Sequence, residues 1–172
     1  LNKEHFDMKR HMVPALLIAL AFAVLVVAPL TAQEFEYGGS KSCKKCHLKQ
    51  FKSWEATTMA QTFETLRPGV KAEEKTAAGL DPHKDYTTDS ACVSCHVTDM
   101  GKPGGFVDEA STPDLLGVGC ESCHGPGQTY IQDEYMSLKN KEYVRSEIVA
   151  VGMVDDPSTT CESCHNADSP TF

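Results

Sequence analysis

The chain has 172 residues, with 16 basic and 24 acidic side chains and a formal net charge of −8. That length accommodates one modest domain or a very short pair of domains. Because nucleic-acid-binding proteins gather basic residues in a patch, the acidic balance argues against that class of function.

The first 32 residues predict a secretory signal peptide preceded by a few upstream residues. From Met8, a Lys-Arg pair leads into an apolar run over residues 13–30, and small residues close the segment at Ala32. The run is also near the minimum length that crosses a bilayer, so a retained membrane anchor is the alternative. Cleavage after Ala32 leaves a domain of residues 33–172 with 13 basic and 22 acidic side chains. This acidity is either a solvated surface or a means of attracting basic partners.

All eight cysteines fall into four CxxC pairs, and a histidine follows every pair. Zinc sites and disulfides both use paired cysteines, but neither requires a histidine in the same place four times. CxxCH is the attachment sequence of c-type haem. The sequence therefore predicts four covalently bound haems, each tethered by two cysteines and ligated by the adjacent histidine. We call these motifs the first to fourth clamps: Cys43, Cys46 and His47; Cys92, Cys95 and His96; Cys120, Cys123 and His124; Cys161, Cys164 and His165.

Four glycines flank the third clamp, at Gly117, Gly119, Gly125 and Gly127. One interpretation is that bare backbone leaves room for a flat haem ring to lie against it. The other interpretation is an ordinary loop.

Between the clamps, the sequence predicts helices and long loops. Residues 48–66 place apolar side chains at three- and four-residue steps, which predicts one amphipathic helix. Residues 70–78 predict a second helix, ended by Gly79. The glycine- and proline-rich residues 98–119 predict a long irregular connection, and residues 128–151 predict one or two helices.

The domain provides about 35 residues for each predicted haem, which is too little protein for an independent apolar core. We therefore expect the haems themselves to form the interior. The predicted fold class is mainly α with long irregular loops, a small multihaem cytochrome c wrapped around four closely packed haems.

A second axial ligand decides what each haem iron does. Outside the clamps and the signal segment, the candidates are His83, Met59, Met100, Met136 and Met153. Met59 lies on the apolar face of its predicted helix, where packing competes with ligation. Methionine in place of histidine raises the reduction potential of a haem, whereas an iron without a second ligand offers a site for a small molecule.

The order of four segments resembles the cytochrome c-554 family. These segments are SCKKCHLKQFKSWEATTMA, LDPHKDYTTDSACVSCHV, GKPGG and GVGCESCHGPG, and the resemblance spans about residues 38–165. It implies a mainly helical fold around four close haems in stacked and perpendicular pairs. It also implies a periplasmic carrier like the family member that accepts electrons from hydroxylamine oxidoreductase in ammonia-oxidising bacteria. In the family three irons carry two histidines, and the iron at the second clamp, here held by His96, is five-coordinate.

Three departures from the family pattern concern the second ligands. Met59 stands where the family has a distal histidine, so it becomes the candidate for the haem of the third clamp. The family's histidine shortly after GPG is missing from residues 128–134, which leaves Met136 or an open site. A further ligand lies beyond the fourth clamp in the family, whereas this chain stops at Phe172. We therefore expect that its C-terminus is truncated.

The main prediction is an exported, periplasmic, bacterial tetrahaem cytochrome that carries electrons between redox proteins and needs no catalytic residue of its own. A multihaem oxidoreductase and a membrane cytochrome are the candidate partners. One alternative is a small redox enzyme acting on a nitrogen compound, such as nitric oxide, at an open haem. Another is a membrane-anchored, quinol-oxidising cytochrome subunit, which requires the N-terminal segment to be retained.

Overall fold

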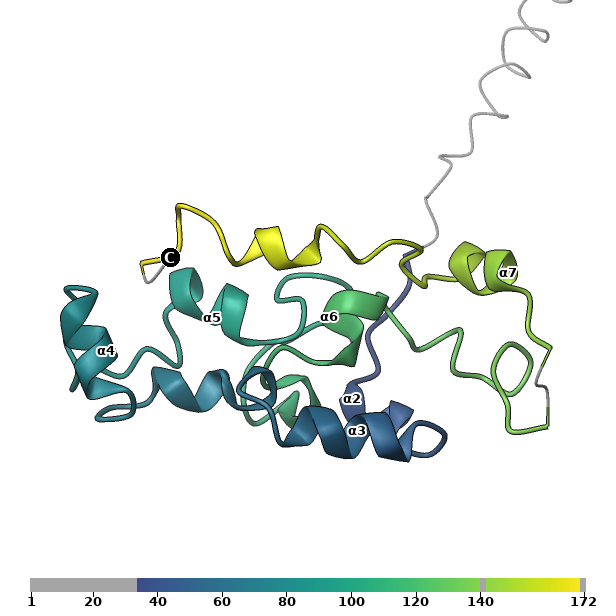
Figure 1. The fold of residues 1–172 in the computed structure, drawn as a ribbon, viewed down its shortest axis with the longest axis horizontal. Coiled ribbons are helices and arrows are strands. Elements are labelled where there is room, and N and C mark those ends of the chain that lie inside the picture. The colour runs from purple at the N-terminus through teal and green to yellow at the C-terminus, as the bar shows by residue number, and fades with distance from the viewer. Residues whose placement is uncertain (1–33, 140–141, 171–172) are drawn as a thin grey trace, which may run out of the picture. The chain divides into compact units, whose positions relative to one another are not determined.

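Short helices joined by loops make up the chain (Figure 1). The computed structural model describes residues 34–139 and 142–170, so the predicted signal peptide lies outside the described residues. Over these ranges the backbone forms no strand, only an isolated antiparallel bridge between Val97 and Leu116. The predicted fold class, mainly α with long irregular loops, is confirmed. The α-helices are α2 (Ser40–Cys43), α3 (Leu48–Glu55), α4 (Ala72–Ala77), α5 (Ser90–His96), α6 (Cys120–His124) and α7 (Arg145–Ala150), and the 3₁₀-helices are η1 (Met59–Gln61), η2 (Phe63–Leu66), η3 (Pro113–Leu115) and η4 (Thr160–Ser163).

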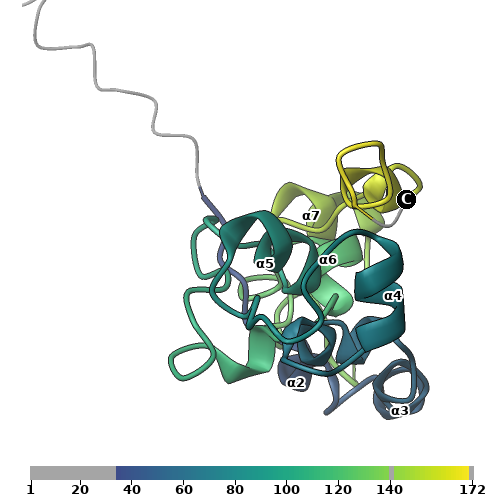
Figure 2. The same ribbon diagram turned by 90° about the vertical axis from the view of Figure 1, so that its left-hand side faces the viewer.

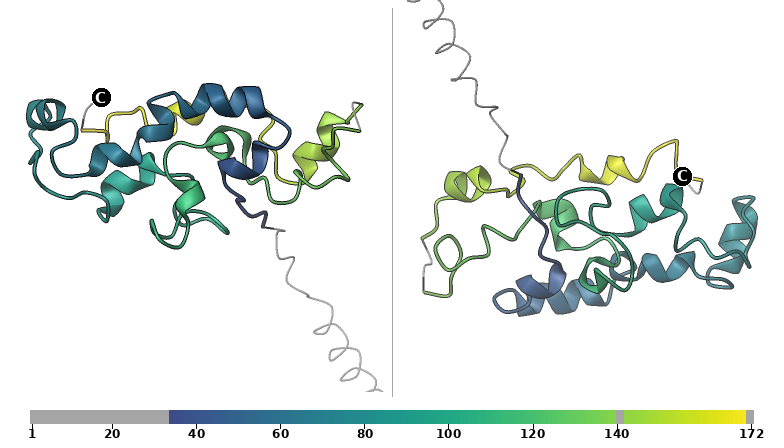
Figure 3. Two further views of the ribbon diagram at one scale, coloured as in Figure 1. Left: turned by 90° about the horizontal axis from the view of Figure 1, so that it is seen from below. Right: turned by 180° about the vertical axis from the view of Figure 1, so that it is seen from behind.

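Residues 34–172 form one compact unit in which α6 is central. Helices α4 and α7 lie toward opposite ends of this unit (Figures 1 and 3). Seen from the α4 end, α6 lies inside, with α2 and α3 on one side and α7 on the other (Figure 2). Helix α2 packs against both α3 and α6. The first and third clamps, which begin in α2 and α6, are therefore neighbours.

The prediction of one continuous amphipathic helix over residues 48–66 is wrong, because the helix is broken. Helix α3 ends at Glu55, and the chain continues through a turn into η1 and η2. The hydroxyls of Thr57, Thr62 and Thr65 donate to carbonyls three residues earlier, at 2.6, 3.1 and 2.6 Å. Such local bonds compete with the regular helical ladder, which explains the break.

The other predicted elements are confirmed with changed boundaries. Helix α4 covers residues 72–77 of the predicted 70–78, and Gly79 follows it with a φ of +73°. Residues 98–119 form a long connection whose only helix among the described elements is the short η3. The described part of residues 128–151 contains one helix, α7.

The hydrophobic core made by side chains alone is small. Ten hydrophobic side chains are buried among the described residues. Seven of them form one cluster around α5 and η2, in which the rings of Phe63 and Phe106 lie 5.9 Å apart between centroids. The cluster comprises Phe63, Leu66, Tyr86, Val93, Val97, Phe106 and Leu115.

The glycines around the third clamp contact the chain's own atoms. A Cβ on Gly117 would lie 2.6 Å from the carbonyl oxygen of Ala60, and a Cβ on Gly125 would collide with the carbonyl oxygen of Gly152. Both glycines have a φ of +78°, which favours glycine in any case. The interpretation that these glycines leave space for a haem ring is therefore wrong at these two positions. They are needed because two backbone segments approach closely.

Glu121, inside the third clamp, is a buried carboxylate that accepts three backbone hydrogen bonds. The residue is only 1% exposed to solvent. One carboxylate oxygen accepts from the backbone N–H groups of Gly38 and Gly127, at 2.9 and 2.6 Å, and the other accepts from Gly39 at 2.7 Å. Because Gly39 immediately precedes α2, Glu121 ties the start of the first clamp's helix to the third clamp.

No helix in the described ranges is long and apolar enough to cross a membrane.

We expect Glu121→Gln to destabilise the haem-loaded protein by about 1 to 3 kcal/mol, because the new amide NH₂ would face at least one of these backbone donors and leave it unpaired. Chemical denaturation monitored by circular dichroism measures this change. The fourth clamp supplies a matched control, since Glu162 occupies the same place in an identical CESCH sequence but is exposed. Glu162→Gln should change the stability by no more than about 0.5 kcal/mol. Equal effects of the two substitutions would contradict the role given to Glu121.

Candidate functional site

Each clamp lies on a helical turn. The second and third clamps lie within α5 and α6. In the first and fourth, the N–H groups of His47 and His165 donate to the carbonyls of Cys43 and Cys161, at 2.9 and 2.8 Å. Residues at positions i, i+3 and i+4 of a helical turn share one face. Two thiols and one imidazole therefore project from the same side of every clamp.

The first and third clamps are neighbours through α2 and α6. The N–H of Cys120 donates to the hydroxyl of Ser40 in α2, at 3.0 Å. The nearness of the two thiols raises the pKa of Cys43 and lowers the pKa of Cys120 to about 6. Thioether bonds would remove both protons, so the lasting consequence of this contact is positional. Groups attached at these two clamps must lie close together.

The second and fourth clamps line one cavity through Cys95 and Cys164, and the fourth clamp lies near the third. Burial raises the pKa of Cys164, a hydrogen bond with the Ser163 hydroxyl lowers it, and the nearby Cys95 thiol raises it. Burial likewise raises the pKa of Cys123, with a smaller contribution from the nearby Cys161. The clamps are thus arranged in the spatial order first, third, fourth, second, which differs from their order along the chain.

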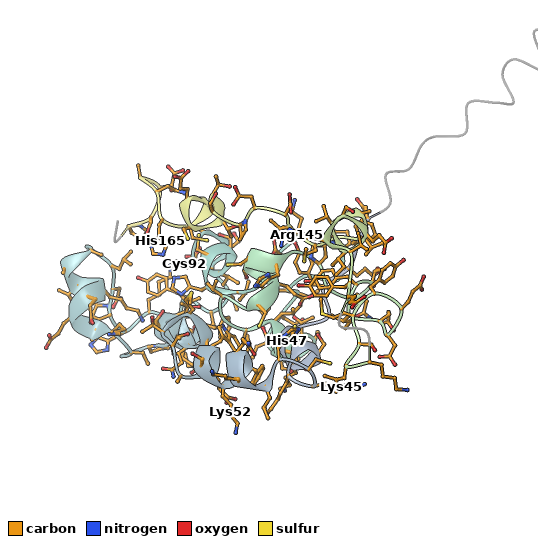
Figure 4. All side chains as sticks on the ribbon, turned by 45° about the vertical axis from the view of Figure 1, so that its right-hand side comes forward. Lys45, His47, Lys52, Cys92, Arg145 and His165 are labelled. Atoms are coloured by element: carbon orange, nitrogen blue, oxygen red, sulfur yellow. The ribbon has the colours of Figure 1, made fainter. Side chains whose placement is uncertain are left out.

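A cavity of about 960 Å³ lies against the second clamp. Cys92, Cys95 and His96 line it together with Cys164 of the fourth clamp. Figure 4 shows Cys92 and His165 on the same side of the molecule. Leu66 and Tyr86, from the apolar cluster, form part of the wall. The cavity offers a large, partly apolar space next to two thiols and an imidazole.

The imidazole of His96 is oriented by the segment that contains η1 and η2. Its Nδ1 lies 2.7 Å from the carbonyl oxygen of Thr62 and 3.2 Å from the hydroxyl of Thr65. A carbonyl oxygen only accepts, so Nδ1 carries the hydrogen and Nε2 keeps its lone pair for a metal. This arrangement is the outer hydrogen bond that metal-ligating histidines usually make.

The remaining clamp histidines are exposed. His47, His124 and His165 all have exposed side chains, as do Cys46 and Cys161. The Nε2 atom of His47 lies 3.5 Å from the sulfur of Met136. A large apolar group attached at one of these clamps would therefore be covered by protein on one side and exposed to solvent on the other.

The other candidate second ligands make no hydrogen bond with a clamp imidazole in the described part of the chain. Met59 has a side chain 47% exposed, and its carbonyl accepts from Val118, two residues before the third clamp. Its ligation of the third-clamp haem stays a prediction. His83 is exposed, and only its backbone N–H is engaged, by Asp81 at 2.8 Å. Met100 is 39% exposed, and Met153 is half-buried after α7.

The donor groups fit c-type haem better than zinc or disulfides. All eight cysteines are free. The described residues contain no group of three or more His, Cys, Asp or Glu side chains that could hold a metal ion. By contrast, each clamp presents two thiols and an imidazole on one face, and the second clamp borders a cavity of suitable chemistry. These are the groups needed for two thioether bonds and one axial bond.

Two supporting features were not predicted from the sequence. The carboxylate of Glu121 and the carbonyl of Thr62 both position clamp residues, yet neither belongs to a recognisable motif. The third and fourth clamps have the same CESCH letters, so no local signal distinguishes the buried Glu121 from the exposed Glu162. A backbone carbonyl such as that of Thr62 leaves no trace in the sequence.

Comparison with known proteins agrees with this geometry. Residues 42–125 match the family described as cytochrome c554 and c-prime. Cytochrome c-554 of Nitrosomonas europaea is 40% identical over 154 residues, which cover 87% of this chain and 66% of the relative. The chain thus spans slightly less than two thirds of that relative's length.

The solved structure of reduced cytochrome c554 from Nitrosomonas europaea is also similar, with a TM-score of 0.71 and 39% identity. The match covers 80% of this chain and 70% of that one. Sequence and fold thus agree, and we conclude that this chain belongs to the cytochrome c554 family and binds c-type haem covalently.

Proposed function

We propose that the chain is an exported tetrahaem electron carrier acting in the bacterial periplasm. The observation that carries this proposal is the proximity of the clamps. The first lies against the third, the fourth lies near the third, and the second and fourth line one cavity. Four redox groups held in such an order form one connected set. The signal-like sequence of residues 1–32 supports export.

The residues of the chain have simple roles in this function. When bound, each haem supplies an iron that is reversibly oxidised and reduced. The eight clamp cysteines fix the positions of the groups, and His47, His96, His124 and His165 ligate from the clamp side. Glu121 holds the first and third clamps together, and the Thr62 carbonyl orients His96. No proton transfer or nucleophile is required of the protein.

The surface beside the first clamp is basic although the protein is acidic. Residues 41–52 contain five exposed lysines, Lys41, Lys44, Lys45, Lys49 and Lys52. Lys41 forms an ion pair with Asp114, and the ammonium of Lys44 lies 4.9 Å from the centre of the Phe51 ring. Lys45 and Lys52 project outward from this side of the molecule (Figure 4). Since the first clamp is one end of the spatial order, we propose that an acidic redox protein docks there.

The candidate partners are a multihaem oxidoreductase and a membrane cytochrome. From the sequence, the net negative charge was expected either to form a solvated surface or to attract basic partners, and the basic surface changes this expectation at the first clamp. Overall acidity suggested attraction of basic partners, whereas the lysines at the first clamp favour an acidic one at this end. Both can hold for two different faces of one carrier.

Lys45→Glu should slow oxidation of the reduced protein by ferricyanide, an anionic probe, about threefold or more at low ionic strength. The reason is that the substitution removes positive charge beside an exposed clamp. Stopped-flow absorbance measures the rate. The difference from the wild type should shrink in 1 M salt, where the screening length is only about 3 Å.

Lys102→Glu is the control, because it changes the net charge equally on an exposed lysine that belongs to the long loop and not to α2 or α3. It should change the ferricyanide rate by less than half as much. Equal slowing by both substitutions would mean that net charge, and not the basic surface at the first clamp, controls the encounter.

A second candidate function is favoured by the cavity at the second clamp. The described residues that line this cavity include His96 but no methionine and no second histidine. An iron at this clamp would then keep one axial position free for a small molecule. This supports the alternative of a redox enzyme acting on a nitrogen compound such as nitric oxide. The alternative of an anchored, quinol-oxidising subunit depends on residues outside the described ranges.

We expect carbon monoxide to bind the reduced protein at the second-clamp haem, because no methionine and no second histidine lines its cavity in the described structure. The Soret spectrum during titration gives the stoichiometry, which should reach at least one per chain. Absence of any carbon monoxide binding would eliminate both the open site and the enzyme candidate. The electron-carrier proposal would be unaffected.

A further inference from the structure

Met136 and His47 are brought together although 89 residues separate them in the chain. The thioether sulfur of Met136 lies 3.5 Å from Nε2 of His47. This nitrogen is the ring atom farthest from the backbone, and it is the one a clamp histidine turns toward its iron. A thioether is a weak acceptor that also ligates iron in c-type cytochromes. The contact therefore joins two groups able to bind one metal.

From this contact we infer that Met136 is the second axial ligand of the haem at the first clamp, opposite His47. The inference adds detail to the proposed electron-carrier function. It rests on that function, because a raised reduction potential matters only if the haem carries electrons. It makes the first clamp the site of a methionine–histidine haem.

Met136 is held on an ordered run that starts at the third clamp. Glu121 fixes Gly127, and the N–H of Ile131 donates to the carbonyl of Gly127 at 3.0 Å. The side chain of Gln132 donates to the carbonyl of Gln128 at 2.9 Å. The N–H of Met136 then donates to the carbonyl of Gln132, also at 2.9 Å. These residues therefore connect the third clamp to the Met136 sulfur, which lies beside the first clamp.

The distance between the two atoms is close to what an iron between them needs. With the bond lengths of zinc as a guide, about 2.0 Å to nitrogen and about 2.3 Å to sulfur, two atoms on opposite sides of a metal lie roughly 4.3 Å apart. The sulfur must withdraw by less than about 1 Å, and the three rotatable bonds of methionine make that movement easy. Met136 is only half-buried, so no packed core resists the shift.

The other three methionines of the domain lack such a contact. Met59 and Met100 are substantially exposed, and Met153 follows α7 without a hydrogen bond to a clamp imidazole in the described structure. If Met136 only packed against the His47 ring, its sulfur would have no reason to lie closest to Nε2, the nitrogen that binds iron. The position also fits the basic docking surface, because methionine ligation raises the potential of the haem nearest the lysines.

The test compares haem-loaded wild type with Met136→Leu, which keeps the size and apolar character of the side chain. Proton NMR of the reduced protein counts methionine methyl groups shifted far upfield by a haem ring. We expect the count to fall by one in Met136→Leu, with partial loss of the far-red absorption band of methionine–iron coordination in the oxidised protein. A redox titration should show one midpoint lowered and the other three unchanged.

Two further variants make the result specific. Met136→His should abolish the same methyl signal yet keep the haem six-coordinate and low-spin, with a lower midpoint. Met153→Leu is the matched control and should leave the methyl signals, the band and every midpoint unchanged. A pyridine haemochrome assay should give four haems per chain in each variant.

An unchanged number of upfield methyl signals in Met136→Leu, or no such signal in the wild type, would overturn the inference. That failure is distinguishable from failure of the proposed function. The wild-type protein would still exchange electrons with ferricyanide and still respond to Lys45→Glu. Loss of those two properties would instead count against the carrier proposal itself.

Discussion

A shortage of apolar side chains governs this structure. Only ten hydrophobic residues are buried in the described part of the chain. The longest helix there, α3, has eight residues. Helices shorter than about 12 residues are marginal in isolation and depend on packing for stability. Seven of the ten buried side chains gather in one cluster, so the exposed clamps elsewhere have little protein to pack against. We infer that covalent haem supplies the large apolar surfaces that the chain lacks at those places.

Position within this fold is set mainly by polar contacts near the clamps. Glu121 gathers three backbone donors and couples the third clamp to the start of α2 and to the run that ends at Met136. The clamps lie in the spatial order first, third, fourth, second. One end of that order carries exposed lysines, and the other borders a cavity. A single arrangement therefore links stability, redox tuning and the surfaces that partners and small molecules can reach.

The sequence predicted chemistry better than geometry. CxxCH is read directly from adjacent residues, so all four clamps and the helical, loop-rich class could be predicted. The break after Glu55 depends on threonine hydroxyls competing for carbonyls, which hydrophobic spacing does not reveal. The burial of Glu121 could not be predicted, because the identical CESCH of the fourth clamp leaves Glu162 exposed. Met136 and His47 lie 89 residues apart in the chain, and their approach depends on the turns between Gly127 and Met136, which periodicity cannot report.

The most direct test of the central claim is the unfolding transition of this chain produced without haem attachment, compared with the haem-loaded protein. If the haems form the interior, the haem-free chain should unfold without a cooperative transition in near-ultraviolet circular dichroism, whereas the loaded protein should unfold in a sharp one. A haem-free chain with a cooperative transition of similar midpoint would contradict the account, because the polypeptide would then have a sufficient core of its own.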